Sequence, residues 1–519
     1  MPIPQQSVEE RQKFQALKKR LIQIWSELAT TPDFAHTSVI APSLSVNQEE
    51  LAKVTGASFY EERLLFALIR LRNPNARVIY VTSQPVHPDI VDYYLDLLDD
   101  VPNRHARERL RMLSVLDSSA RPLSEKILER PRFLQRLKRQ IENPEKAYLT
   151  CYNSTDLERR LAVALDLPLN GLDPDHLVYA TKSGNRRIFA EAGVRFPAGR
   201  EDLHSEDDIV DALVDLAKQR PGIAAAVVKL NEGFGGEGNA IFKYPQERNS
   251  SESVRQALSN LKWTSEGETR DSFLRKFDAM GGIVEEFVIA DEVRSPSVQM
   301  RITPAGEPAL VSSHEQILGG ATGQSYLGCR FPADDSYRTL LLAEANKVGK
   351  VLAAKGVLGR FAIDFMVCRS SGGDWQPNAI EINLRMGGTT PPLLALEFLT
   401  SGQLDTETGQ FLAPDGTPKY YSATDNLKSP AYRGLLPEDL FDIIARHRLG
   451  YRHAIGSGAL FHMIGALSQY GKIGMTCIAD TPGEAQALFE HTVKVLDDEI
   501  DGDEHGVQTP LLDRQYAME

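Results

Sequence analysis

Two apolar stretches separated by a short turn constrain the fold of this chain more than any other feature. The first, residues 360–368, is apolar between its ends except for one carboxylate, and the second spans residues 378–385. Between them, residues 370–374 read Ser-Ser-Gly-Gly-Asp, a composition typical of tight turns. The sequence therefore predicts a β-hairpin whose two strands pair antiparallel.

Polar side chains gather on one face of this predicted hairpin. Strand side chains alternate between faces, so Glu381, Asn383 and Arg385 point one way while the apolar residues between them point into a core. Antiparallel pairing puts Asp364 on the same face. Two carboxylates and an amide oxygen form an all-oxygen site suited to Mg²⁺ bound to nucleotide phosphates. The alternative is an amphipathic hairpin whose polar face is only solvated.

Composition excludes several classes of function. The chain has 519 residues, of which 42% are hydrophobic and 25% charged, as in globular proteins with more than one domain. A net charge of −13 argues against a nucleic-acid partner. Neither an apolar signal-peptide region nor a run of about 20 apolar residues is found, so no membrane partner is expected. Four cysteines without CxxC spacing favour reduced thiols and a cytoplasmic location.

Helical and strand patterns alternate along the chain and predict three domains. Residues 1–170 are expected to form a small α/β domain with a largely parallel sheet, and residues 406–519 a small α/β extension with a polar tail. Between them, residues 171–405 divide into lobes at 171–290 and 291–405. The expected helices are 7–29, 48–71, 89–98, 124–141, 182–193, 205–220, 336–355, 437–446 and 482–498. The expected strands outside the hairpin are 36–41, 77–82, 111–116, 147–151, 224–230, 239–243, 281–288, 296–303, 308–318, 459–467 and 474–480.

A glycine-rich segment follows a buried strand in the first lobe. The strand at 224–230 delivers Lys229, and the sequence Glu-Gly-Phe-Gly-Gly-Glu-Gly then leads into a returning strand at 239–243. Glycines let backbone N–H groups approach phosphate oxygens, and the lysine supplies a compensating charge. The segment lacks the GK[ST] ending of a P-loop, and a plain tight turn is the alternative.

Two further segments are candidate ligand contacts. The backbone at 286–288 offers donors and acceptors for the edge of a nucleotide base, and Glu292 is placed to accept from ribose hydroxyls. A lone glutamate is more often a surface residue. The glycine-rich segment 319–330 is predicted to be a loop that closes over substrate as a lid, and His314 before it is either structural or a substrate contact.

The order of these features resembles the ATP-grasp superfamily across about residues 170–400. The features are Lys182, Lys229, the glycine loop, Glu285-Glu286-Phe287-Val288, Glu292, Asp364 and the sequence Glu381-x-Asn383-x-Arg385. The resemblance implies a fold of mixed α/β and α+β class, in which two lobes grip ATP after a pre-grasp α/β domain. Segments 314–332 and 461–474 further resemble a carboxylate–amine ligase subgroup, typified by the peptide ligase of pheganomycin biosynthesis, and its C-terminal domain.

The resemblance also implies roles for individual residues. Lys182 and Lys229 are expected to bind the nucleotide phosphates, and Arg385 to steady the acyl phosphate or the transition state. The expected Mg²⁺ ligands are Asp364, Glu381 and Asn383. The expected ATP contacts are Lys182, Lys229, Gly233, Phe234, Gly235, Gly236, Gly238, Glu285, Glu286, Phe287, Val288 and Glu292. The catalytic candidates are Arg385, Lys229 and Arg360, and the expected substrate contacts are Arg294, His314, Gly319, Gly320, Arg385, Gly387 and Gly388.

The implied activity is ATP-dependent ligation of a small-molecule carboxylate to an amine or a peptide. ATP phosphorylates the acid, and the amine then displaces phosphate from the acyl phosphate. A small-molecule kinase on the same scaffold and a nucleotide-binding protein without turnover are the alternatives, whereas a biotin-dependent carboxylase is disfavoured because no Met-Lys-Met motif occurs. The sequence defines neither substrate and leaves the assembly open, although a homodimer is the commonest closed form.

Overall fold

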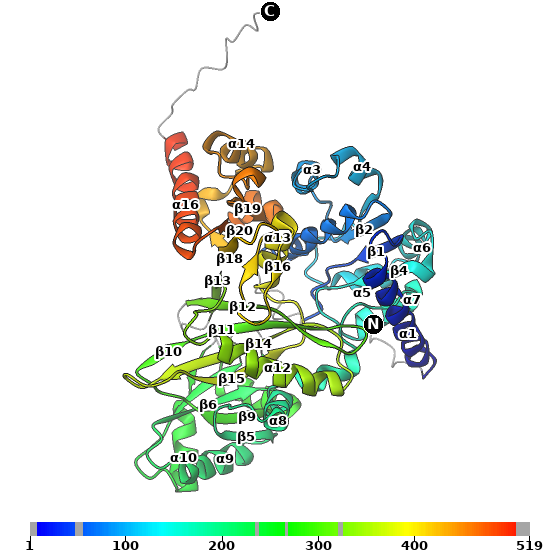
Figure 1. Ribbon diagram of the computed structural model, residues 1–519. Coiled ribbons are helices and arrows are strands. Elements are labelled where there is room, and N and C mark those ends of the chain that lie inside the picture. The colour runs from blue at the N-terminus through cyan, green and yellow to red at the C-terminus, as the bar shows by residue number, and fades with distance from the viewer. Residues whose placement is uncertain (1–7, 47–54, 234–237, 265–267, 320–324, 505–519) are drawn as a thin grey trace, which may run out of the picture.

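Three β-sheets organise the part of the chain that the computed structural model describes, residues 8–46, 55–233, 238–264, 268–319 and 325–504 (Figure 1). They contain four, five and eleven strands. The smallest sheet lies in the N-terminal part and the five-stranded sheet in the first lobe. The largest sheet runs from the second lobe into the C-terminal part.

The N-terminal sheet is entirely parallel, as predicted, with the strand order β3-β2-β1-β4. Alternate residues of β1 and β2 enter two different cores, so helices pack on both faces. The helix predicted at 124–141 is two helices, because Pro131 begins a new one. The elements are α1 (Val8–Thr30), β1 (His36–Ile40), η1 (Ala57–Arg72), β2 (Ala76–Thr82), α3 (Pro88–Asp96), α4 (Asn103–Glu108), β3 (Leu110–Ser114), α5 (Leu123–Leu128), α6 (Pro131–Gln140), η2 (Pro144–Lys146), β4 (Ala147–Thr150) and α7 (Asp156–Leu165).

The first lobe is an antiparallel sheet with the strand order β5-β9-β6-β7-β8. Its entry helix α8 begins at the predicted lysine and ends at Gly193, whose φ of 65° suits a glycine C-cap. The elements are η3 (Pro174–Ala180), α8 (Lys182–Ala192), β5 (Gly199–Leu203), α9 (Glu206–Gln219), β6 (Ala225–Leu230), β7 (Asn239–Lys243), α10 (Ser251–Ala257), η4 (Leu258–Asn260), β8 (Lys262–Trp263), α11 (Arg270–Met280) and β9 (Gly282–Glu286).

The eleven-stranded sheet joins the second lobe to the C-terminal part. Its main path is β10-β14-β11-β12-β13-β18-β17-β16, with β15 added on β14 and β20 added on β18 and β19. The domain boundary expected at residue 405 stays a prediction, since β18 to β20 continue this sheet. The strands are β10 (Glu292–Arg294), β11 (Pro296–Ile302), β12 (Pro308–Gly319), β13 (Ser325–Phe331), β14 (Gly359–Arg369), β15 (Gln376–Asn383), β16 (Gln403–Leu404), β17 (Phe411–Leu412), β18 (Pro418–Lys428), β19 (Gly458–His462) and β20 (Lys472–Ala479).

Helices cover this sheet and complete the C-terminal part. Helix α12 packs on β11 and β12 through buried residues that include Leu341 and Val348. The helical elements are α12 (Arg338–Ala354), α13 (Thr390–Thr400), η5 (Pro430–Tyr432), α14 (Pro437–His447), η6 (His453–Ile455), η7 (Ile464–Ala466), α15 (Leu467–Tyr470) and α16 (Pro482–Glu504). No helix among the described residues has both the length and the hydropathy required to cross a membrane.

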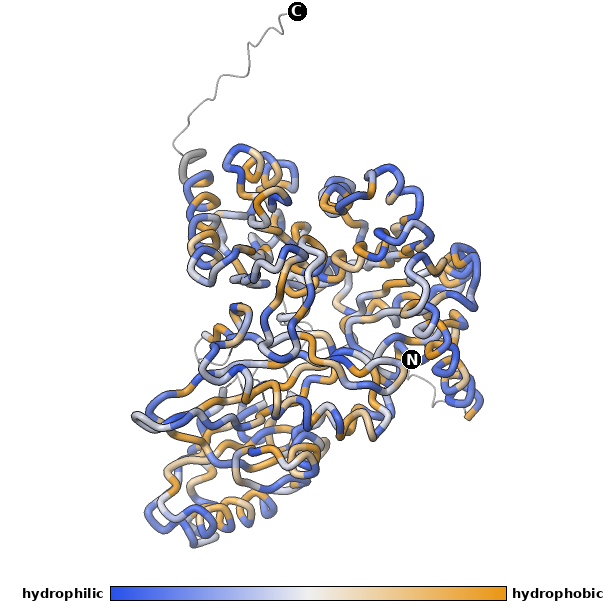
Figure 2. Tube along the Cα trace, viewed as in Figure 1, coloured by the Kyte–Doolittle hydropathy of each residue, from blue (hydrophilic) through white to orange (hydrophobic). Residues whose placement is uncertain are grey.

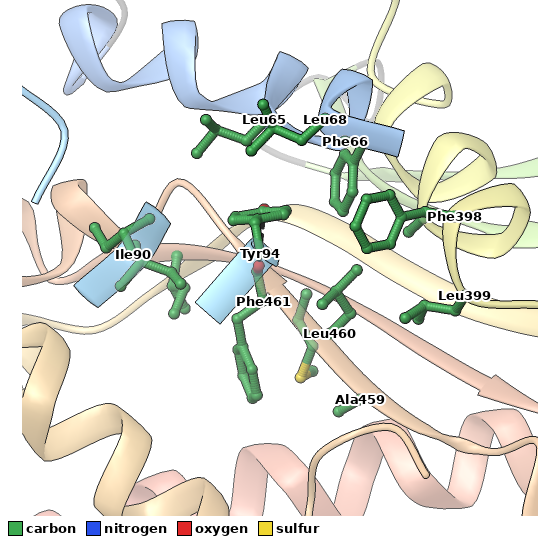
Figure 3. Packing of buried hydrophobic residues seen from close by; sticks show 14 of the residues in the cluster. Leu65, Phe66, Leu68, Ile90, Tyr94, Phe398, Leu399, Ala459, Leu460 and Phe461 are labelled. Atoms are coloured by element: carbon green, nitrogen blue, oxygen red, sulfur yellow. Dashed lines mark hydrogen bonds between the residues drawn. The ribbon is translucent and has the colours of Figure 1, made fainter. Parts of the chain in front are cut away.

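One hydrophobic core joins parts that are far apart in the sequence. Phe66 of η1, Tyr94 of α3, Phe398 of α13 and Phe461 of β19 meet in it, each fully buried (Figure 3). The Tyr94 hydroxyl donates to the carbonyl oxygen of Phe461 at 3.1 Å. Figure 2 shows the general pattern, with apolar residues gathered inside and hydrophilic residues along the outer helices and loops. The N-terminal and C-terminal parts are therefore packed as one body.

The structure corrects the prediction of a loop at 319–330. Residues 325–331 form strand β13, which pairs with β12 on one side and β18 on the other. The loop prediction is therefore wrong for these residues, whereas a role as a lid stays a prediction. Residues 320–324, with Gly320, lie outside the described residues. Strand β18 was also missed, since none of the expected strands covers its residues.

Candidate active site

The predicted hairpin forms, and it brings the two carboxylates together. Asp364 of β14 lies directly opposite Glu381 of β15, and Ala362 lies opposite Asn383. Directly opposed residues in an antiparallel pair share a face, with Cβ atoms about 4.5–5.5 Å apart. The Asn383 side-chain amide donates to Asp364 Oδ2 at 2.9 Å, and Gln316 of β12 donates to Oδ1 at 2.8 Å.

The two carboxylates have different proton affinities. Burial and the adjacent charge of Glu381 raise the pKa of Asp364 to about 7, although the hydrogen bond from Gln316 acts to lower it. Burial would also raise the pKa of Glu381, but Lys182, Arg385 and Lys229 hold it below its ordinary value. These three cations therefore act on one carboxylate of the hairpin. The lysines come from the first lobe and the carboxylates from the second.

Both predicted lysines contact carboxylates. Lys182 Nζ lies 2.5 Å from Glu381 Oε1, and the exposed side-chain fractions of the two residues are 10% and 27%. Lys229 is paired with Glu285, which is buried on the neighbouring strand β9. Arg186 of α8 lies on the other oxygen of Glu285 at 3.7 Å. Cationic side chains from α8 and β6 thus converge on the edge of the hairpin.

Two asparagines that the sequence reasoning missed hold Lys182 in place. The backbone N–H of Lys182 donates to the carbonyl oxygen of Asn231, whose side chain accepts from Ser183 N at 2.9 Å. Asn185 Oδ1 accepts from the backbone N–H of Ile382 at 2.9 Å, which fixes α8 against β15. Their spacing contained a signal, since Asn185 lies one helical turn after Lys182 and Asn231 lies two residues after Lys229.

The segment that is expected to bind the nucleotide phosphates is described only in part. Phe234, Gly235 and Gly236 lie outside the described residues, whereas Gly233 and Gly238 lie inside them. Gly238 has a φ of 78°, a conformation that favours glycine. Downstream, the expected base-binding backbone is partly used in the fold: Glu286 N donates to Ala198 O at 2.8 Å, and Phe287 N donates to Ala225 O at 3.1 Å.

Val288 differs from Glu286 and Phe287. No hydrogen bond joins its backbone to another described residue, so it keeps a donor and an acceptor for a base. The Glu286 side chain pairs with Arg220 at 3.0 Å. Both oxygens of Glu292 accept from Arg369, at 2.7 and 2.9 Å. A ribose would therefore have to share Glu292 with this arginine.

The predicted substrate contacts are spread over several places. Arg294 is exposed on β10 and donates to its neighbour Val293 O. His314 is fully buried, and its Nε2 lies 2.6 Å from the Tyr421 hydroxyl, while burial lowers its pKa to about 3. Gly319 is the last residue of β12. His314 is therefore a neutral core residue, as its structural interpretation expected.

Residues beyond the hairpin form the second side of the site. Arg385 Nη2 donates to Asn383 Oδ1 at 3.1 Å, beside the carboxylate pair. Gly387 N donates to Thr390 Oγ1 at 3.1 Å. A Cβ atom on Gly388 would come within 2.7 Å of the Tyr326 ring, so only glycine fits there. Arg360 lies on β14, with Nη2 3.8 Å from Glu397.

The donor set fits a divalent cation. Asp364 and Glu381 place like charges side by side, and burial together with this neighbouring charge raises the pKa of Asp364. A hard cation with oxygen ligands would relieve that repulsion. Asn383 and Gln316 direct their amide nitrogens to Asp364, so each would have to turn its amide to offer the oxygen to a cation. The roles of these residues stay predictions.

Comparisons with known proteins agree with this arrangement. The family described as "IQCH-like, ATP-grasp" matches residues 176–267 and 263–407, and "PGM1 C-terminal domain" matches 439–492. L-propargylglycine–L-glutamate ligase of Streptantibioticus cattleyicolor is 30% identical over 466 residues, which cover 87% of this chain and 92% of that protein. The chain belongs to the ATP-grasp family. This membership confirms the family resemblance and the fold class that the sequence indicated.

More distant members share the fold. IQ motif-containing protein H of Danio rerio is 24% identical across 94% of this chain, which spans 50% of that protein's length. Biotin carboxylase of Campylobacter jejuni, in complex with an ATP analogue, superposes with a TM-score of 0.54 at 13% identity, covering 92% of this ATP-grasp chain and 96% of its own. The biotin carboxylase domain of Hydrogenobacter thermophilus 2-oxoglutarate carboxylase, solved with MgADP, gives 0.53 at 12% identity, covering 90% and 95%.

Proposed function

We propose that this ATP-grasp protein is an ATP-dependent ligase that joins a small carboxylic acid to an amine or a peptide. The observation that carries the proposal is the meeting of two lobes at one point, where Lys182 Nζ lies 2.5 Å from Glu381 Oε1. The name of the relative from Streptantibioticus cattleyicolor, a ligase of two amino acids, supports the same reaction class. The products would be an amide, ADP and phosphate.

The reaction balances in two steps. A carboxylate oxygen of the acid attacks the γ-phosphorus of ATP, the bond to the β–γ bridging oxygen breaks, and ADP leaves. The amine nitrogen then attacks the acyl carbon, phosphate leaves with the bonding electrons, and the amine gives up a proton. The protein's task is to position the reactants and to stabilise charge, since it forms no covalent bond itself.

Each charged residue has a defined task in this proposal. Lys182 and Lys229 bind phosphate oxygens, and Arg385 stabilises the negative charge that develops on the transferred phosphoryl group. Asp364, Glu381 and Asn383 would hold Mg²⁺, which neutralises phosphate charge when bound. The Val288 backbone meets the adenine base.

The proposal also covers location and assembly. Four buried cysteines without disulfide partners support a reducing compartment such as the cytoplasm. A homodimer is proposed as the assembly, and a dimer is named for the Hydrogenobacter thermophilus relative. Light scattering on the purified protein tests the assembly directly.

ADP release tests the function. We expect release to require Mg²⁺, an acid and an amine together, and the screen should begin with L-propargylglycine and L-glutamate, the amino acids in the relative's name. Asp364→Asn should lower the rate at least about 100-fold, because it weakens the cation site. Asp278→Asn, on an exposed carboxylate of α11, is the matched control and should keep full activity. ADP release with acid alone and a stable phosphorylated product would instead identify a kinase, and full activity in Asp364→Asn would refute the metal assignment.

A further inference from the structure

Three arginines from three different segments lie together next to the active site. They are Arg70 of η1, Arg301 of β11 and Arg360 of β14, here called the arginine cluster. Arg301 and Arg360 are directly opposite each other in the antiparallel pair of β11 and β14, so their Cβ atoms lie about 4.5–5.5 Å apart on one face. Helix α1 of the N-terminal part approaches these strands, since its Trp25 contacts Arg301.

The arginine cluster contains more positive charge than its partners neutralise. No hydrogen bond or ion pair joins the side chain of Arg301 to another described residue, and its guanidinium stacks on the Trp25 ring at 4.4 Å. Arg70 donates to the neutral hydroxyls of Ser38 and Thr150. The one acid paired with the arginine cluster among the described residues is Glu397, 3.8 Å from Arg360 Nη2.

Burial makes this excess charge costly. The Nη1 atom of Arg360 is buried without a hydrogen-bond partner. Burial, together with the charges of Arg360 and Arg70, lowers the pKa of Arg301 to about 10. Like charges placed opposite each other on a sheet destabilise the fold. Charge and hydrogen-bond donors that the fold leaves unsatisfied are the usual preparation for binding an anion.

The position relative to the carboxylate pair defines the length of the ligand. Arg360 and Asp364 are four residues apart on one strand and on the same face, a separation of about 13 Å. Between them lies Ala362, which is buried opposite Gln299 on one side and Asn383 on the other. An anion at the arginine cluster is thus one small-molecule length from the place where the phosphoryl group is transferred.

We infer that the arginine cluster binds a substrate carboxylate that is not consumed in the reaction. Guanidinium groups match the planar geometry of a carboxylate and form paired hydrogen bonds with it. The carboxylate has two sources: the amine substrate, if it is an amino acid or a peptide with a free carboxyl group, or the acid substrate, if it is a dicarboxylate. The assignment to a substrate depends on the proposed ligase function, whereas anion binding itself does not.

Trp25 provides a direct measurement of binding without ATP. Glutarate, added to the full chain at constant ionic strength, should change tryptophan fluorescence in a saturable way, because it binds the arginine stacked on Trp25. Trp25→Phe should remove this fluorescence change, which would show that the change comes from Trp25 and not from the other two tryptophans of the chain. Arg301→Met should weaken binding about tenfold or more, the loss expected for one charged hydrogen bond. Arg446→Met, in an exposed ion pair on α14, is the matched control.

Two outcomes of the fluorescence titration would overturn the inference. One is an equal response to glutarate in wild type and Arg301→Met. The other is an equal response of wild type to inorganic phosphate or chloride, since that would indicate general anion screening. Arg301→Lys keeps the charge but loses the planar fork, so it should also weaken glutarate binding and serves if Arg301→Met does not fold.

Thermal stability separates a binding role from a structural one. Removing a buried, repelled charge should leave the Tm of Arg301→Met equal to or above that of wild type, while glutarate should raise the Tm of wild type more than that of the variant. A lower Tm for Arg301→Met, with equal stabilisation of both proteins by glutarate, would assign Arg301 a structural role and refute the inference.

The ADP-release assay identifies the source of the carboxylate. Two analogues of an active substrate pair are compared with the original pair. In one, a carboxamide replaces the free carboxyl group of the amine substrate. In the other, a carboxamide replaces the second carboxyl group of the acid substrate. We expect one replacement to raise KM about tenfold or more in wild type and much less in Arg301→Met. If no pair releases ADP, the ligase function fails while glutarate binding is still measured; if pairs react and neither replacement matters, the inference fails and the ligase function stands.

Discussion

At the scale of single residues, the candidate site is a balanced set of charges. Lys182 is paired with Glu381, and Lys229 with Glu285, across short distances inside the fold. A triphosphate would take both lysines as partners, and a divalent cation would take the carboxylates. Binding then exchanges one set of ion pairs for another, so no uncompensated charge has to be buried.

Removing one member of such a pair leaves the other without compensation. In Lys182→Met, Glu381 loses its nearest cation while its side chain remains only 27% exposed. We expect a loss of about 1–3 kcal/mol in the free energy of unfolding, reduced from the value for a fully buried pair by solvent screening. The double variant Lys182→Met/Glu381→Gln should recover most of this stability.

Binding and stability should respond differently in these variants. ATP affinity, measured by calorimetry, should fall at least about tenfold in both, because both lack the lysine. A double-mutant cycle over the two positions gives the coupling energy. Equal instability of the single and double variants would show that the pair does not couple, and unchanged ATP affinity would exclude Lys182 from the nucleotide site.

At the scale of elements, the hairpin was predictable because its signals are local. Turn residues at 370–374 and alternation around Glu381 specify two strands and the face that each side chain takes, and β14 and β15 follow that pattern. Helix α8 was equally predictable, since the signals for its start and for its glycine C-cap lie in the sequence close to each end of the helix. The sequence could therefore predict which polar side chains of these elements lie on the same face.

Features that depend on distant pairing were not predictable. Strand β13 contains Gly328 and was expected to be a loop, and its strand state comes from pairing with β12 and β18. The bidentate contact of Arg369 with Glu292 joins residues 77 positions apart. The arginine cluster likewise forms only when η1, β11 and β14 come together in the fold, so the spacing of its arginines in the sequence does not predict it.

The pair of β19 and β20 contains a buried histidine that makes stability depend on pH. His462 packs against Phe66 and close to Gly474, and neither of its ring nitrogens has a hydrogen-bond partner. Burial, with a smaller contribution from Arg63, lowers the pKa of His462 to about 3. The unfolded chain therefore binds a proton below about pH 6.5 that the folded chain does not bind, so this residue lowers stability as pH falls from about 6.5 to about 3.

His462→Leu should flatten this dependence. We expect the slope of unfolding free energy against pH, between about pH 6 and 4, to be smaller by up to about 1.4 kcal/mol per pH unit than in wild type. Near pH 7.5 the variant should be equally or more stable, because it removes two unsatisfied polar atoms. Denaturant titration at several pH values measures both effects, with the exposed His491→Leu as control. An unchanged slope would mean that His462 is not neutral in the folded state.

At the scale of the whole molecule, the cores divide the chain differently from its sequence order. One core contains residues from η1, α3, α13 and β19, so the N-terminal and C-terminal parts share it (Figure 3). The five-stranded sheet has a separate core, which includes Phe273 and Phe277 of α11. The lobe that carries Lys229 is thus packed mainly on itself, which would suit a lobe that closes on a nucleotide and reopens in the proposed function.

This division predicts two cooperative units in calorimetry. Phe273 and Phe398 are both fully buried phenylalanines, one in the core of the lobe and one in the shared core. Each change to alanine should cost about 3–5 kcal/mol, but in different transitions. Phe273→Ala should lower only the transition of the lobe, and Phe398→Ala only that of the larger body. MgATP should raise the transition of the lobe and bring the two closer, since the nucleotide contacts both units. A single transition that both variants lower equally would mean that the lobe unfolds with the rest of the chain, and its closure would then require another hinge.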